Sequence, residues 1–181
     1  MNPVFTIGHS TRPLDEFLAL LAGERVTLLL DVRTVPRSRH NPQFNRDTLP
    51  GALADAGIGY RHLAELGGLR HTRKDSPNGG WRNASFRGYA DYMQTPEFAA
   101  AIDEVVALAA QQRCALMCAE AVPWRCHRSL IADALSVRGI EVDDIIGEHG
   151  ATAHRLTPFA RVDGTTITYP PASPDPGSAP G

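Results

Sequence analysis

The chain has 181 residues, of which 43% are hydrophobic and 21% charged, and its net charge at pH 7 is -2. These values are typical of one globular domain, and the net charge excludes a general affinity for nucleic acids or anionic membranes. The sequence has no basic stretch followed by an apolar core at its amino terminus, no apolar run of the roughly 18 residues needed to span a bilayer, and no even set of cysteines for a disulfide framework. We therefore expect a cytoplasmic protein without a membrane partner.

The amino-terminal part of the chain predicts a β-α-β unit. Residues 4–7 are a short strand, and Ser10 or Thr11 is expected to cap a helix that ends at Gly23, because its apolar residues recur at helical spacing. The nearly continuous apolar run over residues 26–32 is typical of a strand in the middle of a parallel sheet. The same alternation continues through the rest of the chain.

The later elements are separated by two long loops, over residues 33–45 and 67–84. A loop as long as the second is usually functional or disordered. Helices are expected over residues 44–56, 86–93, 96–112 and 125–138. Strands are expected over residues 58–62, 115–118, 142–146 and 152–156. Residues 170–181 have no large apolar side chain, so we expect a disordered tail after a single domain over residues 1–169.

Strands that alternate with helices predict an α/β fold. We expect a three-layer sandwich with a mostly parallel central sheet of about five to six strands and helices on both faces. In such folds ligands bind beyond the carboxyl ends of the strands. Polar or titratable residues leave the predicted sheet at these ends: His9, Ser10, Asp31, Arg33, Arg61, His62, Cys118 and Glu120.

The strongest candidate site is the segment from Cys118 to Arg128. Cys118 ends a buried strand, Glu120 lies in the following loop, and Cys126, His127 and Arg128 open the next predicted helix. Free N–H groups at a helix start favour a thiolate and a bound anion, so Cys126 has the clearer physical reason to be reactive. Each of these residues alone has an ordinary structural explanation, but the combination favours a site.

The plan of strand, cysteine, loop and helix also occurs in cysteine phosphatases and rhodanese-type sulfur transferases. The spacing from Cys118 to Arg125 is one residue too long for a phosphatase, so the comparison is an analogy. The loop after residue 31 forms a second group of candidates, because Asp31 would orient an arginine or a ligand hydroxyl. Arg33 and Arg37 would contact an anion, although a solvated basic loop is the alternative. We expect this loop and the cysteines to share one anion pocket.

A set of short motifs resembles the bacterial family called domain of unknown function 488, over about residues 7–156. The motifs are Ile-Gly-His-Ser-Thr at 7–11, Asp-Val-Arg at 31–33, Pro-Arg-Ser at 36–38, Phe-Asn at 44–45, Leu-Gly-Gly at 66–68, the segment 86–93, Met-Cys-Ala-Glu at 117–120 and Cys-His-Arg at 126–128. The resemblance implies a compact α/β domain with no established activity. Some members carry a methyltransferase label, but the residues after the first strand lack a glycine-rich cofactor fingerprint, so we adopt no cofactor.

Three functions remain open. The first is an enzyme, such as a cysteine-dependent transferase or hydrolase, acting on an anionic, phosphate- or sulfur-containing small molecule or nucleotide. Its catalytic candidates are Cys118, Glu120, Cys126, His127 and Asp31, and its anion-binding candidates are Arg33, Arg37, Arg128, His9 and Ser10.

The second function is a nucleic-acid-binding or -processing module, because ten basic residues stand against four acidic ones between Arg33 and Arg87. The third is a metal or redox sensor. The spacing of the cysteines and histidines does not fit a zinc knuckle or ribbon, so we name no metal ligands. The substrate and the oligomeric state are left open by the sequence.

Overall fold

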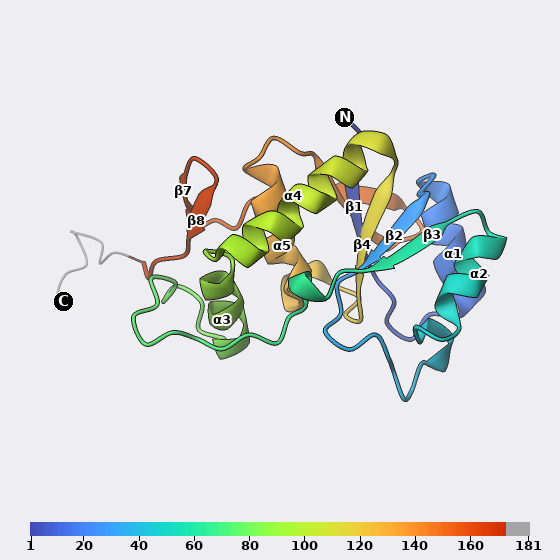
Figure 1. Cartoon of the computed structure of the whole chain (residues 1–181), viewed down its shortest axis with the longest axis horizontal. Helices are drawn as coiled ribbons and strands as arrows, with labels where there is room; N and C mark the ends of the chain where they lie inside the picture. Colours follow the sequence, from blue (N-terminus) through green and yellow to red (C-terminus); the bar gives the residue numbers. More distant parts are fainter. Residues whose placement is uncertain (173–181) are drawn as a thin grey trace.

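A six-stranded sheet forms the centre of the computed structural model, which describes residues 1–172 (Figure 1). Its strand order is β3-β2-β4-β1-β5-β6. The first five strands in this order are parallel and β6 is antiparallel to β5. The strands are β1 (Val4–Gly8), β2 (Leu28–Asp31), β3 (Gly59–His62), β4 (Cys114–Cys118), β5 (Val142–Gly147) and β6 (Gly150–Ala153). The predicted mostly parallel sheet is confirmed.

Helices cover both faces of this sheet, as predicted. One face carries α1 (Leu14–Gly23) and α2 (Leu49–Asp55), and the other carries α3 (Ala84–Tyr92), α4 (Pro96–Gln111) and α5 (Arg128–Ser136). Successive side chains of a strand point to opposite faces. Leu29 of β2 therefore packs in the same cluster as Phe17 of α1, while Leu28 and Leu30 join the cluster that contains Leu130 of α5. This explains why the three residues of β2 that precede Asp31 are all leucines.

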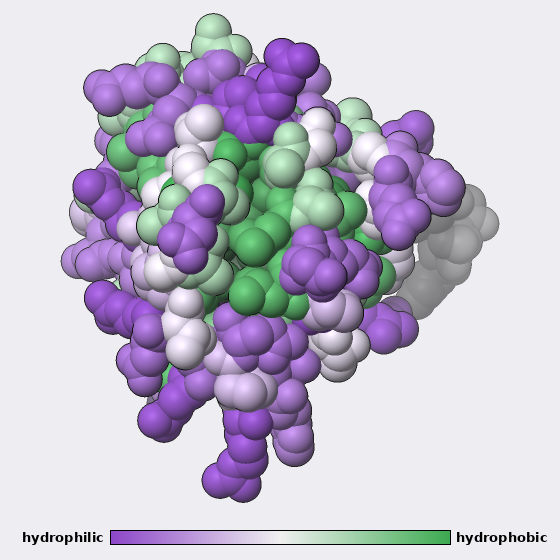
Figure 2. Space-filling view, turned by 90° about the vertical axis from the view of Figure 1, so that its right-hand side faces the viewer, coloured by the Kyte–Doolittle hydropathy of each residue, from purple (hydrophilic) through white to green (hydrophobic). Residues whose placement is uncertain are grey.

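The side of the molecule that carries α1 and α2 exposes both apolar and hydrophilic side chains. Figure 2 looks onto the side of the molecule that carries these two helices, and apolar side chains gather near its centre within a ring of hydrophilic ones. Leu14, Leu18 and Leu20 of α1 are partly buried against the cluster beneath them. In residues 1–172 no helix combines the length and the apolar character that crossing a membrane requires.

Several helix starts differ from the predictions. α1 begins after Pro13 without a side-chain cap, so the expected capping by Ser10 or Thr11 is wrong; Ser10 instead adopts a left-handed conformation with φ of 48°. α2 begins at Leu49 rather than at residue 44, because Pro50 is tolerated only in the first helical turn. α5 begins at Arg128, so Cys126 lies just before the helix.

The structure also contains a hairpin that the sequence patterns did not predict. Strands β7 (Arg161–Asp163) and β8 (Thr166–Thr168) pair antiparallel around Gly164, whose φ is 63°. The chain then reaches Tyr169, whose side chain is fully buried. Residues 173–181, most of the predicted tail, lie outside the described residues.

Candidate functional site

The carboxyl ends of β1 and β4 meet through an unusually close backbone contact. Gly8 pairs with Cys118, and the pairing continues through a hydrogen bond of 2.9 Å from the His9 N–H to the Cys118 carbonyl. A Cβ atom on Gly8 would lie 1.7 Å from the Glu120 carbonyl oxygen. Only glycine therefore lets the loop after β4 cross β1 at this point. The crossing fixes the position of Cys118 at the carboxyl end of β4.

Two free cysteines lie side by side at this edge. The Sγ atoms of Cys118 and Cys126 are 2.7 Å apart, with the Cys126 thiol donating to Cys118. The turn Pro123–Arg125 precedes Cys126 and brings the chain back over the end of β4. Cys118 is 2% exposed and Cys126 is 7% exposed. The fold thus brings together two free cysteines that are eight residues apart in the sequence.

Arg128 holds Cys118 from the other side. Its side chain is fully buried, and its Nη1 lies 2.8 Å from the Cys118 Sγ. The same guanidinium donates to the carbonyl oxygens of Glu120 and Ala121, and its Nε donates to the Thr6 hydroxyl at 3.2 Å. These contacts place the charge of Arg128 beside a protein thiol and use the guanidinium to shape the loop after β4.

The two thiols have opposite tendencies to ionise. Burial opposes ionisation of Cys118, but the hydrogen bond from Cys126 and the charge and hydrogen bond of Arg128 outweigh it and lower the pKa of Cys118 to about 7. The hydrogen bond to Cys118, together with burial, raises the pKa of Cys126 far above its ordinary value. The contacts with Arg128 and Cys126 therefore favour Cys118 as the thiolate of the pair, whereas the argument from the helix start favoured Cys126.

His127 is a neutral imidazole beside the pair. Its Nε2 lies 3.0 Å from the Val32 carbonyl oxygen and must donate to it, so Nδ1 carries the lone pair. Nδ1 is 3.5 Å from the Cys126 Sγ. Burial is the main reason that the pKa of His127 falls to about 4. A Cβ on Gly68 would lie 2.8 Å from Nδ1, so this glycine also permits a close approach.

A cleft of about 390 Å³ opens onto the cysteines. Its walls include Cys118, Cys126 and His127 together with Glu120, Arg125 and Arg33. Glu120 and Arg125 are exposed, whereas Arg33 is buried. The cleft therefore joins residues from the loops after β2 and β4, as expected for the carboxyl edge of a parallel sheet.

Asp31 orients Arg33 and does not itself line the cleft. The fully buried carboxylate accepts two hydrogen bonds from the Arg33 guanidinium, at 2.9 and 2.7 Å, and one from the Tyr60 hydroxyl at 2.6 Å. Arg33 also donates to the Phe44 carbonyl at 2.8 Å. The structure places Asp31 behind Arg33, so any effect of this carboxylate on the cleft passes through the arginine.

His9 reaches Arg33 rather than the cysteines. It stacks on Phe44 with ring centroids 4.5 Å apart, its Nδ1 donates to the Ser10 carbonyl at 2.8 Å, and its Nε2 lies 3.4 Å from the Arg33 Nη1. Burial lowers the pKa of His9, which favours the neutral ring. His9 and Ser10 are absent from the walls of the cleft formed by the described residues.

Arg37 lies away from the cleft and does not share a pocket with the cysteines. It lines a separate cavity of about 490 Å³ with Ser38 and Arg39. The loop closes on itself there, because the Ser38 N–H donates to the Asn45 side chain at 2.6 Å. The expected common pocket is correct for Arg33 and wrong for Arg37.

Three of the cations in the basic segment from residue 33 to 87 pair with carboxylates, and two more have uncharged partners. Five of its ten cations contact partners within the chain: Arg33 binds Asp31, Arg61 binds Glu104, Arg70 lies over Tyr92, Arg73 binds Asp75 and Arg87 donates to the Trp81 carbonyl. Side chains with such partners are less available to a phosphate backbone. The segment therefore offers fewer phosphate contacts than its composition suggests.

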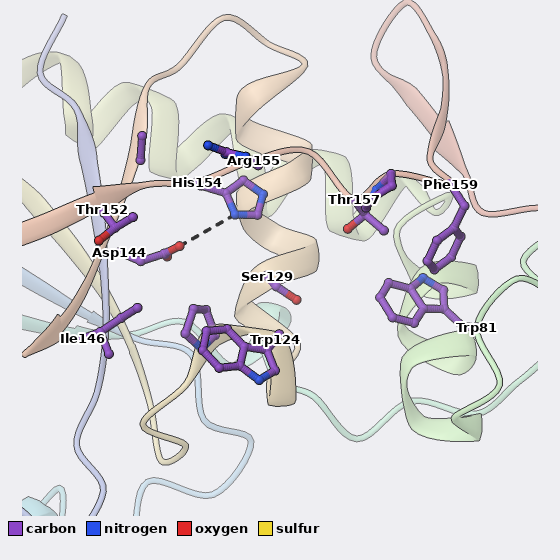
Figure 3. A pocket seen from close by; sticks show the side chains of 13 residues that line it. Trp81, Trp124, Ser129, Asp144, Ile146, Thr152, His154, Arg155, Thr157 and Phe159 are labelled. Carbon is purple, nitrogen blue, oxygen red and sulfur yellow. Dashed lines mark ion pairs between the residues drawn. The ribbon is translucent and has the colours of Figure 1, made fainter.

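A second, larger cavity was not foreseen from the sequence. It has a volume of about 560 Å³ and lies beside α5 (Figure 3). Trp124 stands on one side, and Trp81 and Phe159 stand on the other. The two tryptophans are the only ones in the chain, and Trp124 is 64% exposed. Trp124, next to Arg125, was the indication of this cavity in the sequence. No local pattern indicated that the chain near Phe159 returns to face it.

A buried polar network forms one wall of this second cavity. His154 lies 2.8 Å from a carboxylate oxygen of Asp133 and 3.8 Å from one of Asp144 (Figure 3 draws the second pair). Asp144 accepts from the Thr6 hydroxyl, which in turn accepts from Arg128. Burial opposes the charge on His154, but the two aspartates prevail and raise its pKa to about 9. The network thus extends through Asp144 and Thr6 to the arginine that holds Cys118.

In the described part of the chain, no three His, Cys, Asp or Glu side chains gather closely enough to hold a metal ion.

The fold and the site define an α/β domain that carries a cysteine pair at the carboxyl edge of its parallel sheet. The chain belongs to the family described as Domain of unknown function DUF488, whose model matches residues 13–135. A stretch of 72 residues is 36% identical to Glycogen synthase 1 of Geobacter sulfurreducens, and it covers 37% of this chain and 14% of that protein. No solved structure matches the chain.

Proposed function

We propose that the protein is an enzyme that uses Cys118 as a nucleophile on an anionic small molecule bound in the cleft. The observation that carries this proposal is the position of the Cys118 sulfur, which lies 2.7 Å from the Cys126 thiol and 2.8 Å from the Arg128 guanidinium. Both neighbours donate hydrogen bonds, so they stabilise a thiolate at the wall of the cleft. A thiolate is the nucleophilic form of cysteine.

The charges around the cleft support an anionic substrate. Arg125 is exposed at the rim, and the buried Arg33, whose Nε and Nη2 are already bound to Asp31, adds positive charge at the wall of the cleft. Arginine forks bind phosphate and carboxylate groups in a bidentate manner. In the proposed reaction the Cys118 sulfur attacks an electrophilic phosphorus or sulfur atom, and the bond to the leaving group breaks. Glu120, which lines the same cleft, gives a proton to the leaving group. Water or a second nucleophile then takes the bound group from sulfur, returns a proton to Glu120 and releases the Cys118 thiolate.

The aromatic cavity favours a nucleotide within this substrate class. The turn Pro123–Arg125 borders both cavities, because Trp124 lines the aromatic cavity and Arg125 lines the cleft. On the opposite side Trp81 contacts Phe86 at 5.0 Å between ring centroids, and Phe86 lines the cleft. Aromatic side chains stack on bases. A nucleotide would therefore place its phosphate near Arg125 and its base near Trp124.

The proposal is tested by comparing a negatively charged alkylating reagent with a neutral one. Iodoacetate and iodoacetamide attack the same thiolate, but only iodoacetate is attracted by cationic groups. We expect Cys118 to prefer iodoacetate more strongly than free cysteine does, and Arg125→Gln to reduce that preference. Peptide mass spectrometry assigns the modified residue. Cys114 is the internal control, because burial raises its pKa to about 11. An unreactive Cys118, or one that disfavours iodoacetate, contradicts the proposal.

A further inference from the structure

We propose that Cys118 and Cys126 form a two-cysteine redox couple that reduces a small hydroperoxide and passes through a Cys118–Cys126 disulfide. This activity shares the Cys118 thiolate with the proposed function, but it requires no anionic substrate and no arginine at the rim. It gives Cys126 a chemical role of its own, as the cysteine that resolves the oxidised form of Cys118. The notable feature is that both sulfurs already lie at reacting distance.

The geometry separates the roles of the two sulfurs. Cys118 receives hydrogen bonds from the Cys126 thiol and the Arg128 guanidinium, so it is the sulfur that attacks first. While Cys118 is anionic, Cys126 keeps its proton and donates it in a hydrogen bond to the Cys118 sulfur. The Nδ1 of His127 lies 3.5 Å from the Cys126 Sγ and carries a lone pair. It can accept a hydrogen bond from the Cys126 thiol once Cys118 no longer does.

The first step consumes the oxidant. The Cys118 thiolate attacks the terminal oxygen of the hydroperoxide, the O–O bond breaks, and Cys118 becomes a sulfenic acid, while the other oxygen takes a proton from water and leaves as an alcohol or water. In the second step the Cys126 sulfur attacks the Cys118 sulfur and passes its proton to the departing hydroxyl group. The S–S bond forms, the S–O bond breaks, and the hydroxide leaves as water with that proton. Two thiols are oxidised by two electrons and one peroxide is reduced.

The exposure of the two sulfurs limits the oxidant to a small molecule. Cys118 is 2% exposed and Cys126 is 7% exposed, so a protein disulfide cannot reach them without movement of the surrounding chain. Hydrogen peroxide is small enough to enter along the cleft that both residues line. A small thiol must then reduce the disulfide by exchange at Cys126, the more exposed of the two sulfurs, to complete a turnover.

The experiment treats the full-length reduced protein with one equivalent of hydrogen peroxide. We expect the intact mass to fall by two hydrogen atoms, peptide mapping under non-reducing conditions to find a Cys118–Cys126 bond, and a small thiol to reverse it. Cys126→Ser should stop at a sulfenic acid on Cys118 that dimedone traps. Cys118→Ser should consume no peroxide, and Cys114→Ser should behave as wild type, because Cys114 lies at the opposite end of β4.

Three results would overturn the proposal. One is the absence of an intramolecular disulfide in the wild-type protein, a second is a disulfide that involves Cys114, and a third is peroxide turnover with thiol that is the same in Cys126→Ser as in wild type. The first measurement needs no variant, so it stands even where a substitution prevents folding. Alkylation of Cys118 by iodoacetate is measured separately. A Cys118 that prefers iodoacetate but forms no disulfide leaves the proposed function intact and removes only the redox couple.

Discussion

The buried guanidinium of Arg128 lies 2.8 Å from the sulfur of Cys118 and also binds the loop that follows it. One side chain thus lowers the pKa of the Cys118 thiol and also sets the course of the chain around it. Charged groups that are fully buried must find such partners, because burying an isolated charge is strongly unfavourable. Replacing the Arg128 guanidinium should therefore change both the pKa of Cys118 and the free energy of unfolding of the domain.

The substitution Arg128→Lys tests this double role. It keeps a positive charge but cannot reach Cys118, Ala121 and Thr6 at once. We expect the pKa of Cys118, measured from the pH dependence of iodoacetamide alkylation, to rise above its value of about 7. We also expect the free energy of unfolding to fall by roughly 3 kcal/mol, because the partly buried Glu120 and Ala121 carbonyl groups and the buried Thr6 hydroxyl lose a donor. Arg161→Lys, at an exposed position, is the matched control and should change neither quantity.

The ion pairs of His154 predict how stability depends on pH. Its pKa is about 9 in the folded protein, against 6.5 for an unperturbed histidine. Because the folded state binds this proton more tightly, the contribution is fully present below pH 6.5 and is lost as the pH rises through 9. It amounts to about 3 kcal/mol at most. Cys118 has the opposite trend, since its lowered pKa adds stability as the pH rises from about 7 to 9.

The comparison with His154→Gln separates these two trends. The variant lacks the titrating imidazole but keeps the Cys118 thiol, so the difference in unfolding free energy between wild type and variant isolates His154. We expect this difference to shrink between pH 6.5 and 9 in denaturant titrations. A difference that stays constant over that range would contradict an ionised His154 between Asp133 and Asp144.

Gly8→Ala tests the close crossing of β1 by the loop after β4. The new methyl group would overlap the Glu120 carbonyl, so we expect a loss of at least about 3 kcal/mol in the free energy of unfolding. Gly51→Ala is the matched control, because the exposed Gly51 lies in α2 with open space around it. That substitution should stabilise the protein by up to about 1 kcal/mol. Equal effects of the two substitutions would show that the crossing does not depend on glycine.

Tryptophan fluorescence tests nucleotide binding in the aromatic cavity. Both tryptophans of the chain line this cavity, so stacking of a base should quench the emission. We expect titration with a nucleoside monophosphate to give a saturable signal that Trp124→Phe weakens. Arg125→Gln should weaken binding of the nucleotide but not that of the uncharged nucleoside. A signal that never saturates, or one that Trp124→Phe leaves unchanged, would exclude stacking at this position.

The parts of the fold that the sequence could predict are those governed by local patterns. The apolar run of β2 and the helical spacing in α4 each follow from which faces are buried, and both elements were located within a few residues. The hairpin of β7 and β8 was missed because strands of three residues are too short to show an alternation. Its position depends on Tyr169, which donates to Asp133 from a distant part of the chain.

The candidate site was predictable in its location but not in its internal roles. The rule on the carboxyl ends of parallel strands correctly brought Cys118 and Arg33 to the same cleft. The ionisation of the two thiols depends on where the Arg128 guanidinium points, which no local pattern specifies. Reasoning from the helix start alone therefore favoured Cys126. The outward position of Arg37 was equally hidden, because it results from the hydrogen bonds that close its own loop.

The place of β5 in the sheet has a practical consequence for where the domain can be cut. The family model ends at residue 135, but β5 pairs with β1 in the interior of the sheet and follows that boundary in the chain. A fragment that stopped at residue 135 would turn β1 into an unprotected edge, and exposed edges of this kind promote aggregation. Tyr169 forms hydrogen bonds with Asn78 and Asp133, so a stable fragment would also need the chain up to residue 169. The smallest autonomous folding unit within this chain is therefore longer than the segment by which its family is recognised.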